Sequence, residues 1–229
     1  MVRIDLRGHG ETPTSGELTV ARLAADVEEL VVHLDLRDVL GIGWSLGAML
    51  LWTVLTGPQR SRFAGAVVVD MSPRVGNADD WTLGLMDEEL RAPIPGETWE
   101  DRCRRIASVI VADGLQDERG ELVEQMAHWM AVADPDAVTA IGLSMMDQDF
   151  RDLLPLIDAP TLIIHGARSQ YYSAATSIFL LDQLPASTLS SFRHSGHTPH
   201  LEEPERFNTV VAGFAAALSS IQNSEHRGG

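Results

Sequence analysis

The sequence has one cysteine, few basic residues and no long apolar run. With only Cys103 the chain cannot form an internal disulfide, and no paired Cys/His spacing suggests a zinc site. The 17 basic residues face 33 acidic ones, which gives a net charge of −16. This charge repels phosphate backbones and anionic lipid, so neither nucleic-acid nor membrane binding is expected. No window approaches the roughly 18 apolar residues of a membrane span, and no signal-peptide core follows Met1. These absences predict a cytoplasmic protein.

The apolar residues that are present alternate between two spacings. Short β-branched runs predict strands at 2–4, 39–42, 64–69, 161–164 and 188–192. Helical spacing predicts helices over 19–34, 48–55, 173–184 and 204–218, and the polar tail 219–229 is expected to fray. Strands that alternate with helices predict an α/β fold, with a mostly parallel sheet covered by helices on both faces.

A block of different character interrupts this alternation. Residues 74–155 lack β-branched runs, and 99–111 and 121–132 have helix-like patterns. The block lies between the predicted strand ending before Asp70 and the one starting at Thr161, so it would emerge at the carboxyl edge of the sheet, where such folds bind ligands. We therefore predict an α/β core formed by 1–73 and 156–229, with a helical lid (cap) inserted at 74–155.

The motif Gly43-Trp44-Ser45-Leu46-Gly47 falls between a predicted strand and a predicted helix. In that context G-x-S-x-G holds the serine on a sharp, strained turn and exposes its Oγ at the sheet edge. The backbone N–H of Leu46 then lies at a helix N-terminus, where it can donate to a developing oxyanion. A dinucleotide loop is the main rival, since Gly41-Ile42-Gly43 is followed by Asp70 at the end of the next strand. Its fingerprint fails by one position, because Leu46 stands where the third glycine belongs.

Four motifs in order resemble the α/β-hydrolases, closest to the capped esterase, haloperoxidase-like and C–C hydrolase branch. They are 5–11 (DLRGHGE), the Ser45 turn, 159–166 (APTLIIHG) and 196–204 (GHTPHLEEP). The resemblance implies that Ser45 is the nucleophile, that His197 is its base, and that Trp44 and Leu46 contact the substrate or oxyanion. His194 and His200 are expected to be surface residues, and Glu202 and Glu203 to begin the closing helix.

The acid of the triad is less directly indicated. The family's commonest acid stands three residues after Gly166, where this chain has Ser169. Other members carry the acid after the strand that follows the nucleophile helix, and Asp70 stands there. We predict Asp70 as the triad acid, the alternative being that it caps the turn at Ser72-Pro73.

The beginning of the chain departs from the family pattern. In the family three strands precede the one that matches residues 2–4, and the loop after the third carries the second oxyanion donor. Without that third strand, the strands ending at Asp5 and Ile42 would lie ~10 Å apart instead of ~4.8 Å, with unpaired backbone groups between them. The expectation is an N-terminally incomplete α/β-hydrolase, the alternative being a rearranged copy of the fold. The loss of one oxyanion donor would lower the rate by roughly 10²–10³.

The expected function is hydrolysis of a small to medium, largely apolar ester or lactone through an acyl-enzyme, without metal or cofactor. The substrate is thus a small molecule, and no oligomeric state is indicated. The alternatives are C–C bond hydrolysis of a diketone and a non-catalytic fragment or pseudoenzyme of the same fold. An apolar pocket would be formed by the tryptophans and methionines in or near the inserted block: Trp81, Trp99, Trp129, Met86, Met126, Met130, Met145 and Met146.

Overall fold

The computed structural model describes residues 1–87 and 94–228, of which 221–228 are described by their backbone. Its sheet has four parallel strands in the spatial order β1-β2-β3-β4. The strands are β1 (Val39–Trp44), β2 (Phe63–Val69), β3 (Thr161–Gly166) and β4 (Ser187–Phe192). All four carboxyl ends therefore meet at one edge of the sheet, as the alternating sequence pattern predicts.

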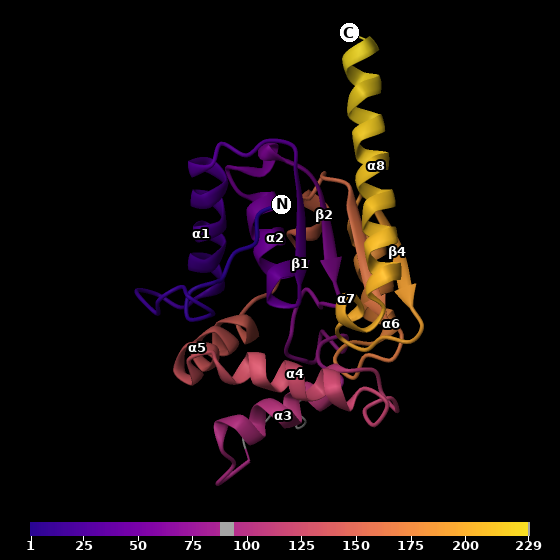
Figure 1. Ribbon diagram of the computed structural model, residues 1–229. Helices are drawn as coiled ribbons and strands as arrows, with labels where there is room; N and C mark the ends of the chain where they lie inside the picture. Colours follow the sequence, from indigo (N-terminus) through magenta and orange to yellow (C-terminus); the bar gives the residue numbers. More distant parts are fainter. Residues whose placement is uncertain (88–93, 229) are drawn as a thin grey trace.

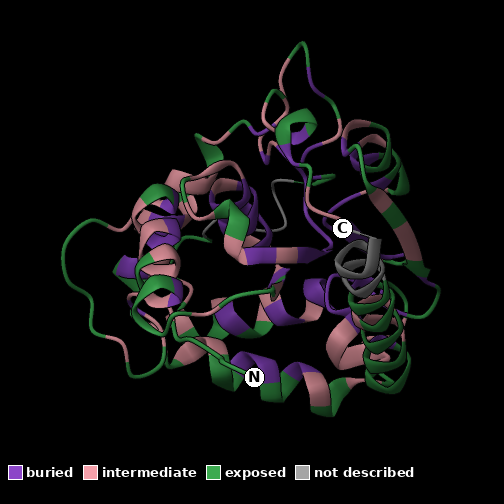
Figure 2. Cartoon of the chain, turned by 90° about the horizontal axis from the view of Figure 1, so that it is seen from above, coloured by how far each residue is buried: buried purple, intermediate pink, exposed green. Residues whose placement is uncertain are grey.

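Helices cover both faces of this sheet (Figure 1). They are α1 (Val20–His33), α2 (Leu46–Thr56), α6 (Ala174–Gln183), α7 (Pro199–Glu202) and α8 (Pro204–Gly228), with short 3₁₀ helices at Arg60–Arg62 and Leu154–Leu156. Successive strand residues point to opposite faces, so Val68 joins the cluster formed with α1, α2 and α6, whereas Val69 joins the cluster under α8. Figure 2 shows the helices buried on the side toward the sheet and exposed outside.

The inserted block forms three helices: α3 (Trp99–Ile110), α4 (Gly120–Ala131) and α5 (Pro135–Met146). They lie beyond the carboxyl edge of the strands (Figure 1). Local chemistry fixes where two of them begin. The Thr98 side chain accepts a hydrogen bond from the Asp101 N–H at the start of α3, and the Asp134 carboxylate accepts from the N–H groups of Asp136 and Ala137 at the start of α5.

The strand predicted at Val2–Ile4 is wrong. Residues 1–6 have no regular secondary structure, and Val2 and Ile4 are exposed. A strand needs a neighbour for its backbone groups, and β1 pairs only with β2 in the described part of the chain. Side chains hold this N-terminal segment instead. Arg7 forms an ion pair with Asp26 of α1, and Gly8, at φ +73°, lies so close to α5 that an added Cβ would clash.

The C-terminal end also differs from expectation. The closing helix was predicted to stop near Leu218, with a frayed tail, whereas α8 continues to Gly228 and extends beyond the sheet (Figure 1). Within the described residues, none of the helices has the length and apolar character that crossing a membrane would require.

Candidate active site

Ser45 lies at the turn from β1 into α2, with φ 52° and ψ −119°. A positive φ is strained for a residue other than glycine and is held here by the surrounding contacts. The Ser45 N–H donates to the Val69 carbonyl at 3.1 Å, which ties the turn to β2. Gly43 permits the fold-back, because a Cβ there would lie 2.3 Å from the Gly47 backbone. Leu46 opens α2, so its N–H belongs to the helix start, where backbone donors lack an intrahelical acceptor.

Asp70 follows β2 at the same edge, and its fully buried carboxylate accepts four hydrogen bonds. His165 Nδ1 (3.0 Å) and the Gly166 N–H (3.1 Å) donate to Oδ1. Ser169 Oγ (2.6 Å) and His197 Nδ1 (2.8 Å) donate to Oδ2. Burial alone would raise the pKa of Asp70, but the hydrogen bonds from His165 and His197 outweigh it and hold the pKa of this carboxyl below its usual range. Asp70 is therefore anionic at neutral pH.

The His197 imidazole is fixed from several sides. Its ring stacks on Tyr171, with the ring centroids 4.2 Å apart and the planes at 8°. Its backbone N–H donates to the Ile110 carbonyl at 2.8 Å. Trp44, the residue before Ser45, donates from Nε1 to the His197 carbonyl at 2.7 Å, and the two rings lie 5.3 Å apart. With Nδ1 engaged by Asp70, the imidazole has Nε2 for proton exchange.

His165 is a component of this cluster to which the sequence reasoning assigned no role. The sequence places it only within the motif 159–166, which contains β3. The register pairs Val69 with Ile164, so Asp70 and His165 follow at adjacent positions on neighbouring strands. Once β2 and β3 are known to be neighbours in the sheet, this register predicts the contact between Asp70 and His165. Ser169 stands at the position of the family's commonest acid but carries no charge. Its hydroxyl donates a hydrogen bond to the Asp70 carboxylate.

Asp70 also decides against the dinucleotide-loop alternative. A ribose hydroxyl would need an accessible carboxylate, whereas that of Asp70 is buried and bound by four donors of the chain itself.

Two expectations about neighbouring residues need correction. His194 is exposed, as expected, but His200 is only partly exposed, with its Nδ1 buried, and its ring lies near those of Trp44 (5.1 Å) and Phe207 (5.8 Å). Burial, and secondarily the charge of His197, lowers the pKa of His200 to about 4. Glu202 does not begin the closing helix; it ends α7, and its carboxylate is fully buried.

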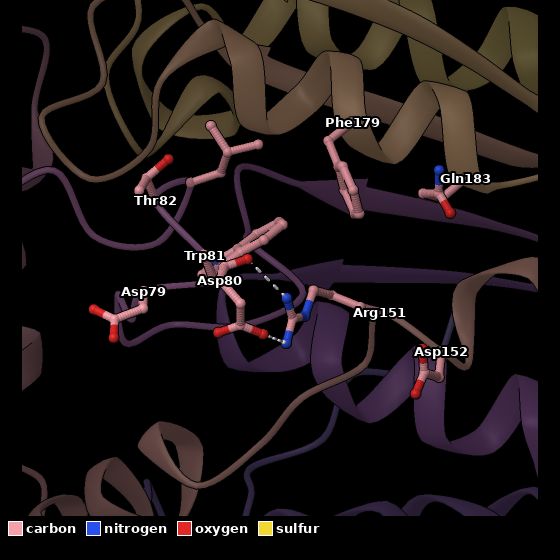
Figure 3. Close-up of a pocket in the computed structure, with 9 residues that line it drawn as sticks. Asp79, Asp80, Trp81, Thr82, Arg151, Asp152, Phe179 and Gln183 are labelled. Atoms are coloured by element: carbon pink, nitrogen blue, oxygen red, sulfur yellow. Dashed lines mark hydrogen bonds and ion pairs between the residues drawn. The ribbon is translucent and has the colours of Figure 1, made fainter.

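The aromatic and methionine residues expected to form a pocket are dispersed. Trp129, Met86 and Met146 are exposed, whereas Met126 is buried in the main core. Trp81 lines an open cavity of about 710 Å³ (Figure 3). That cavity is bordered by Asp79, Asp80 and Arg151, and none of Ser45, Asp70 and His197 lines it.

Comparison with known proteins identifies one family for this chain. The model of the alpha/beta hydrolase family matches residues 1–210. The chain is 27% identical to 3-oxoadipate enol-lactonase 2 of Acinetobacter baylyi, over 90% of this chain and 75% of that protein. It is 29% identical to a pimeloyl-[acyl-carrier protein] methyl ester esterase of Aromatoleum aromaticum, over 87% and 81%.

Solved structures agree on the fold. An esterase from Exiguobacterium antarcticum superposes with a TM-score of 0.84 at 22% identity, covering 93% of this chain and 80% of that one. With the family model matching most of the residues, the chain belongs to the alpha/beta hydrolase family.

Proposed function

We propose that this protein is a serine hydrolase that cleaves carboxylic esters or lactones through an acyl-enzyme on Ser45. The observation that carries the proposal is the buried Asp70–His197 hydrogen bond, at the same sheet edge as a serine with φ 52°. A serine becomes nucleophilic when an oriented imidazole can take its proton, and the imidazole is oriented by a buried carboxylate.

In this proposal His197 accepts the Ser45 Oγ proton as Oγ attacks the ester carbonyl carbon. The Leu46 N–H, at the N-terminus of α2, donates to the resulting oxyanion. His197 then gives the proton to the leaving alcohol, and a water molecule, activated in the same way, releases the acid. Asp70 holds the Nδ1 proton and stabilises the imidazolium.

Trp44 has two roles in the proposal. Its indole N–H holds the His197 carbonyl, and its place beside Ser45 puts it near the bound substrate. Leu46 is the oxyanion donor in this proposal, and Trp44 contacts the substrate.

We further propose that 74–155 forms a lid over a core made of 1–73 and 156–229. The position of α3, α4 and α5 beyond the carboxyl ends of the strands supports this division (Figure 1). Buried residues of the block, such as Met126 and Ile141, belong to the same apolar cluster as Met49 of α2. A cover packed in this way excludes water and favours a small to medium, largely apolar substrate.

The choice of ester chemistry draws on the relatives. One similar protein is named an enol-lactonase and another a methyl ester esterase. Both names denote hydrolysis of a carboxylic ester bond, cyclic in one case and linear in the other. We therefore place the substrate of this chain in that class.

Covalent labelling with a fluorophosphonate tests the proposal directly. The reagent forms a phosphonyl bond only with an activated serine, so the parent chain should be labelled and Ser45→Ala should not. Both proteins should also be assayed with p-nitrophenyl acetate after circular dichroism shows that they are folded. Equal labelling of the two would place the reactive group elsewhere. No labelling of a folded parent would favour the non-catalytic alternative.

A further inference from the structure

The carboxylate of Glu202 lies between the loop that carries His197 and the inserted block. Its Oε1 accepts hydrogen bonds from the Gly196 N–H (2.7 Å), the Thr198 N–H (3.3 Å) and the Thr198 hydroxyl (3.0 Å). Gly196 and Thr198 flank His197 on both sides. The side chain of Glu202 is fully buried, so water does not compete for these bonds.

The other oxygen faces the segment that follows α3. Oε2 accepts from the Ala112 N–H at 2.7 Å and from the guanidinium of Arg119. Arg119 also donates to the His194 carbonyl at 2.6 Å, so it holds the same loop at a second point. One carboxylate thus joins two segments about ninety positions apart in sequence.

The backbones of these segments are in direct contact as well. A Cβ on Gly196 would lie 2.5 Å from the Val111 carbonyl carbon and 2.6 Å from the Ala112 nitrogen. The His197 N–H donates to Ile110, the last residue of α3. The loop of His197 therefore cannot shift without moving residues 110–112.

We propose that Glu202, together with Arg119, is a positioning residue for His197 that makes the placement of the imidazole depend on the inserted block. This inference rests on the proposed function, because it concerns the base of that reaction. Glu202 contacts the residues on either side of His197 and acts through them. Proton transfer needs the imidazole within hydrogen-bond reach of the serine, and a displacement of about 1 Å can cost about 10² in rate.

The test compares Glu202→Gln and Arg119→Met with the parent. Glutamine keeps the shape of Glu202 but turns an N–H₂ group toward the donors around one of the two oxygens. Methionine keeps the apolar stem of Arg119 without its charge. Glu124→Gln is the matched control, because it breaks the Glu124–Arg104 ion pair (3.0 Å), which joins α3 and α4 within the inserted block. Thermal unfolding should first show that each variant is folded at the assay temperature.

Three readouts are taken: kcat and KM for p-nitrophenyl acetate, the rate of fluorophosphonate labelling, and the far-downfield proton resonance of His197 Nδ1, assigned with His197→Asn. We expect kcat and the labelling rate to fall about 10- to 100-fold in both test variants. KM should change less than about twofold, because the loss is in the transition state. The His197 resonance should shift or broaden, and Glu124→Gln should match the parent in every readout.

An unchanged kcat and resonance in folded Glu202→Gln and Arg119→Met would overturn the inference while the labelled parent still supports the hydrolase proposal. If Glu202→Gln does not fold, Arg119→Met decides alone. If the parent is neither active nor labelled, the proposed function fails, and the resonance still tells whether Glu202 positions His197.

Discussion

Replacing Asp70 by asparagine should abolish most activity for a reason that the geometry specifies. Asparagine has the shape of aspartate, but one of its two polar ends is an N–H donor. Of the four groups around Asp70, the Gly166 N–H can only donate, so the amide oxygen must stay on the side of Gly166 and His165. The amide nitrogen then faces Ser169 and His197.

This orientation forces His197 into the wrong tautomer. Nδ1 must accept a hydrogen bond from the amide, which leaves the proton on Nε2, and a protonated Nε2 cannot take the proton of Ser45. The corresponding change in serine proteases lowers kcat by about 10⁴. That factor corresponds to about 5 kcal/mol of activation free energy.

The loss of stability should be smaller than the loss of activity. His197 can reverse its hydrogen-bonding role at Nδ1, and the bonds from His165 and Gly166 to the amide oxygen survive. The bond to Ser169 is weakened, because its Oγ already accepts from the N–H groups of Tyr171 (3.2 Å) and Tyr172 (3.4 Å). We expect the free energy of unfolding to fall by about 1–3 kcal/mol. Neutral hydrogen bonds at this buried site are weaker than charged ones, but the variant no longer has to desolvate a charge.

The assay measures kcat for p-nitrophenyl acetate and the unfolding free energy in urea for the parent and Asp70→Asn. A variant within about tenfold of the parent kcat would refute the tautomer argument, since the predicted loss is about a thousand times larger than that. The tautomer argument would equally be refuted if kcat fell 10⁴-fold only because Asp70→Asn is unfolded.

The pH dependence of stability gives an independent check. The pKa of Asp70 in the folded protein lies below its usual value, so its charge stabilises the fold at every pH above about 3.9. This contribution is lost as the pH falls through the lower, folded-state pKa. The difference in unfolding free energy between the parent and Asp70→Asn should therefore be constant near neutral pH and shrink below about pH 4. A difference that grows on acidification would contradict the direction of the shift.

Three further predictions follow from the same geometry. Adding Ser169→Asp to Asp70→Asn should raise kcat at least about tenfold above that of Asp70→Asn. The Ser169 hydroxyl lies 2.6 Å from the Asp70 oxygen that binds His197 Nδ1, so a carboxylate at 169 would lie near the imidazole. No recovery in a folded double variant would show that position 169 cannot supply the acid. His200, with a pKa of about 4 against an ordinary 6.5, makes the parent lose stability as the pH falls from about 6.5 to 4, so His200→Phe should flatten that slope in urea titrations. An unchanged slope would assign it to other groups. Ile164→Ala, at a fully buried position, should cost about 2–5 kcal/mol of unfolding free energy. Ile42→Ala, on the same sheet face but 53% exposed, should cost at most about 0.5 kcal/mol, and equal costs would mean that the exposed face of β1 is covered in solution.

Much of the fold follows from local patterns in the sequence. The alternation of β-branched runs and helical spacing predicts the four parallel strands and, apart from the C-terminal end of α8, the helices around them within a few residues. The residues 43–47 predict the strained turn at Ser45 because only a strand, a sharp turn and a helix in succession suit that motif. Residues 2–4 have a pattern that suits a strand but do not form one. A strand exists only beside another strand, and no local pattern shows whether a neighbour is present.

The contacts of the triad acid depend on the order of the strands in the sheet. Asp70 was predicted as the triad acid from its place after β2, and its contacts to His165 and His197 join positions 95 and 127 residues apart. The partial burial of His200 and the burial of Glu202 likewise come from elements distant in sequence. The sequence by itself determined which residue types stand at the ends of the strands, because those follow from local spacing. Only the tertiary structure decided which of them share one carboxylate, because hydrogen bonds between distant segments depend on how the strands pack side by side.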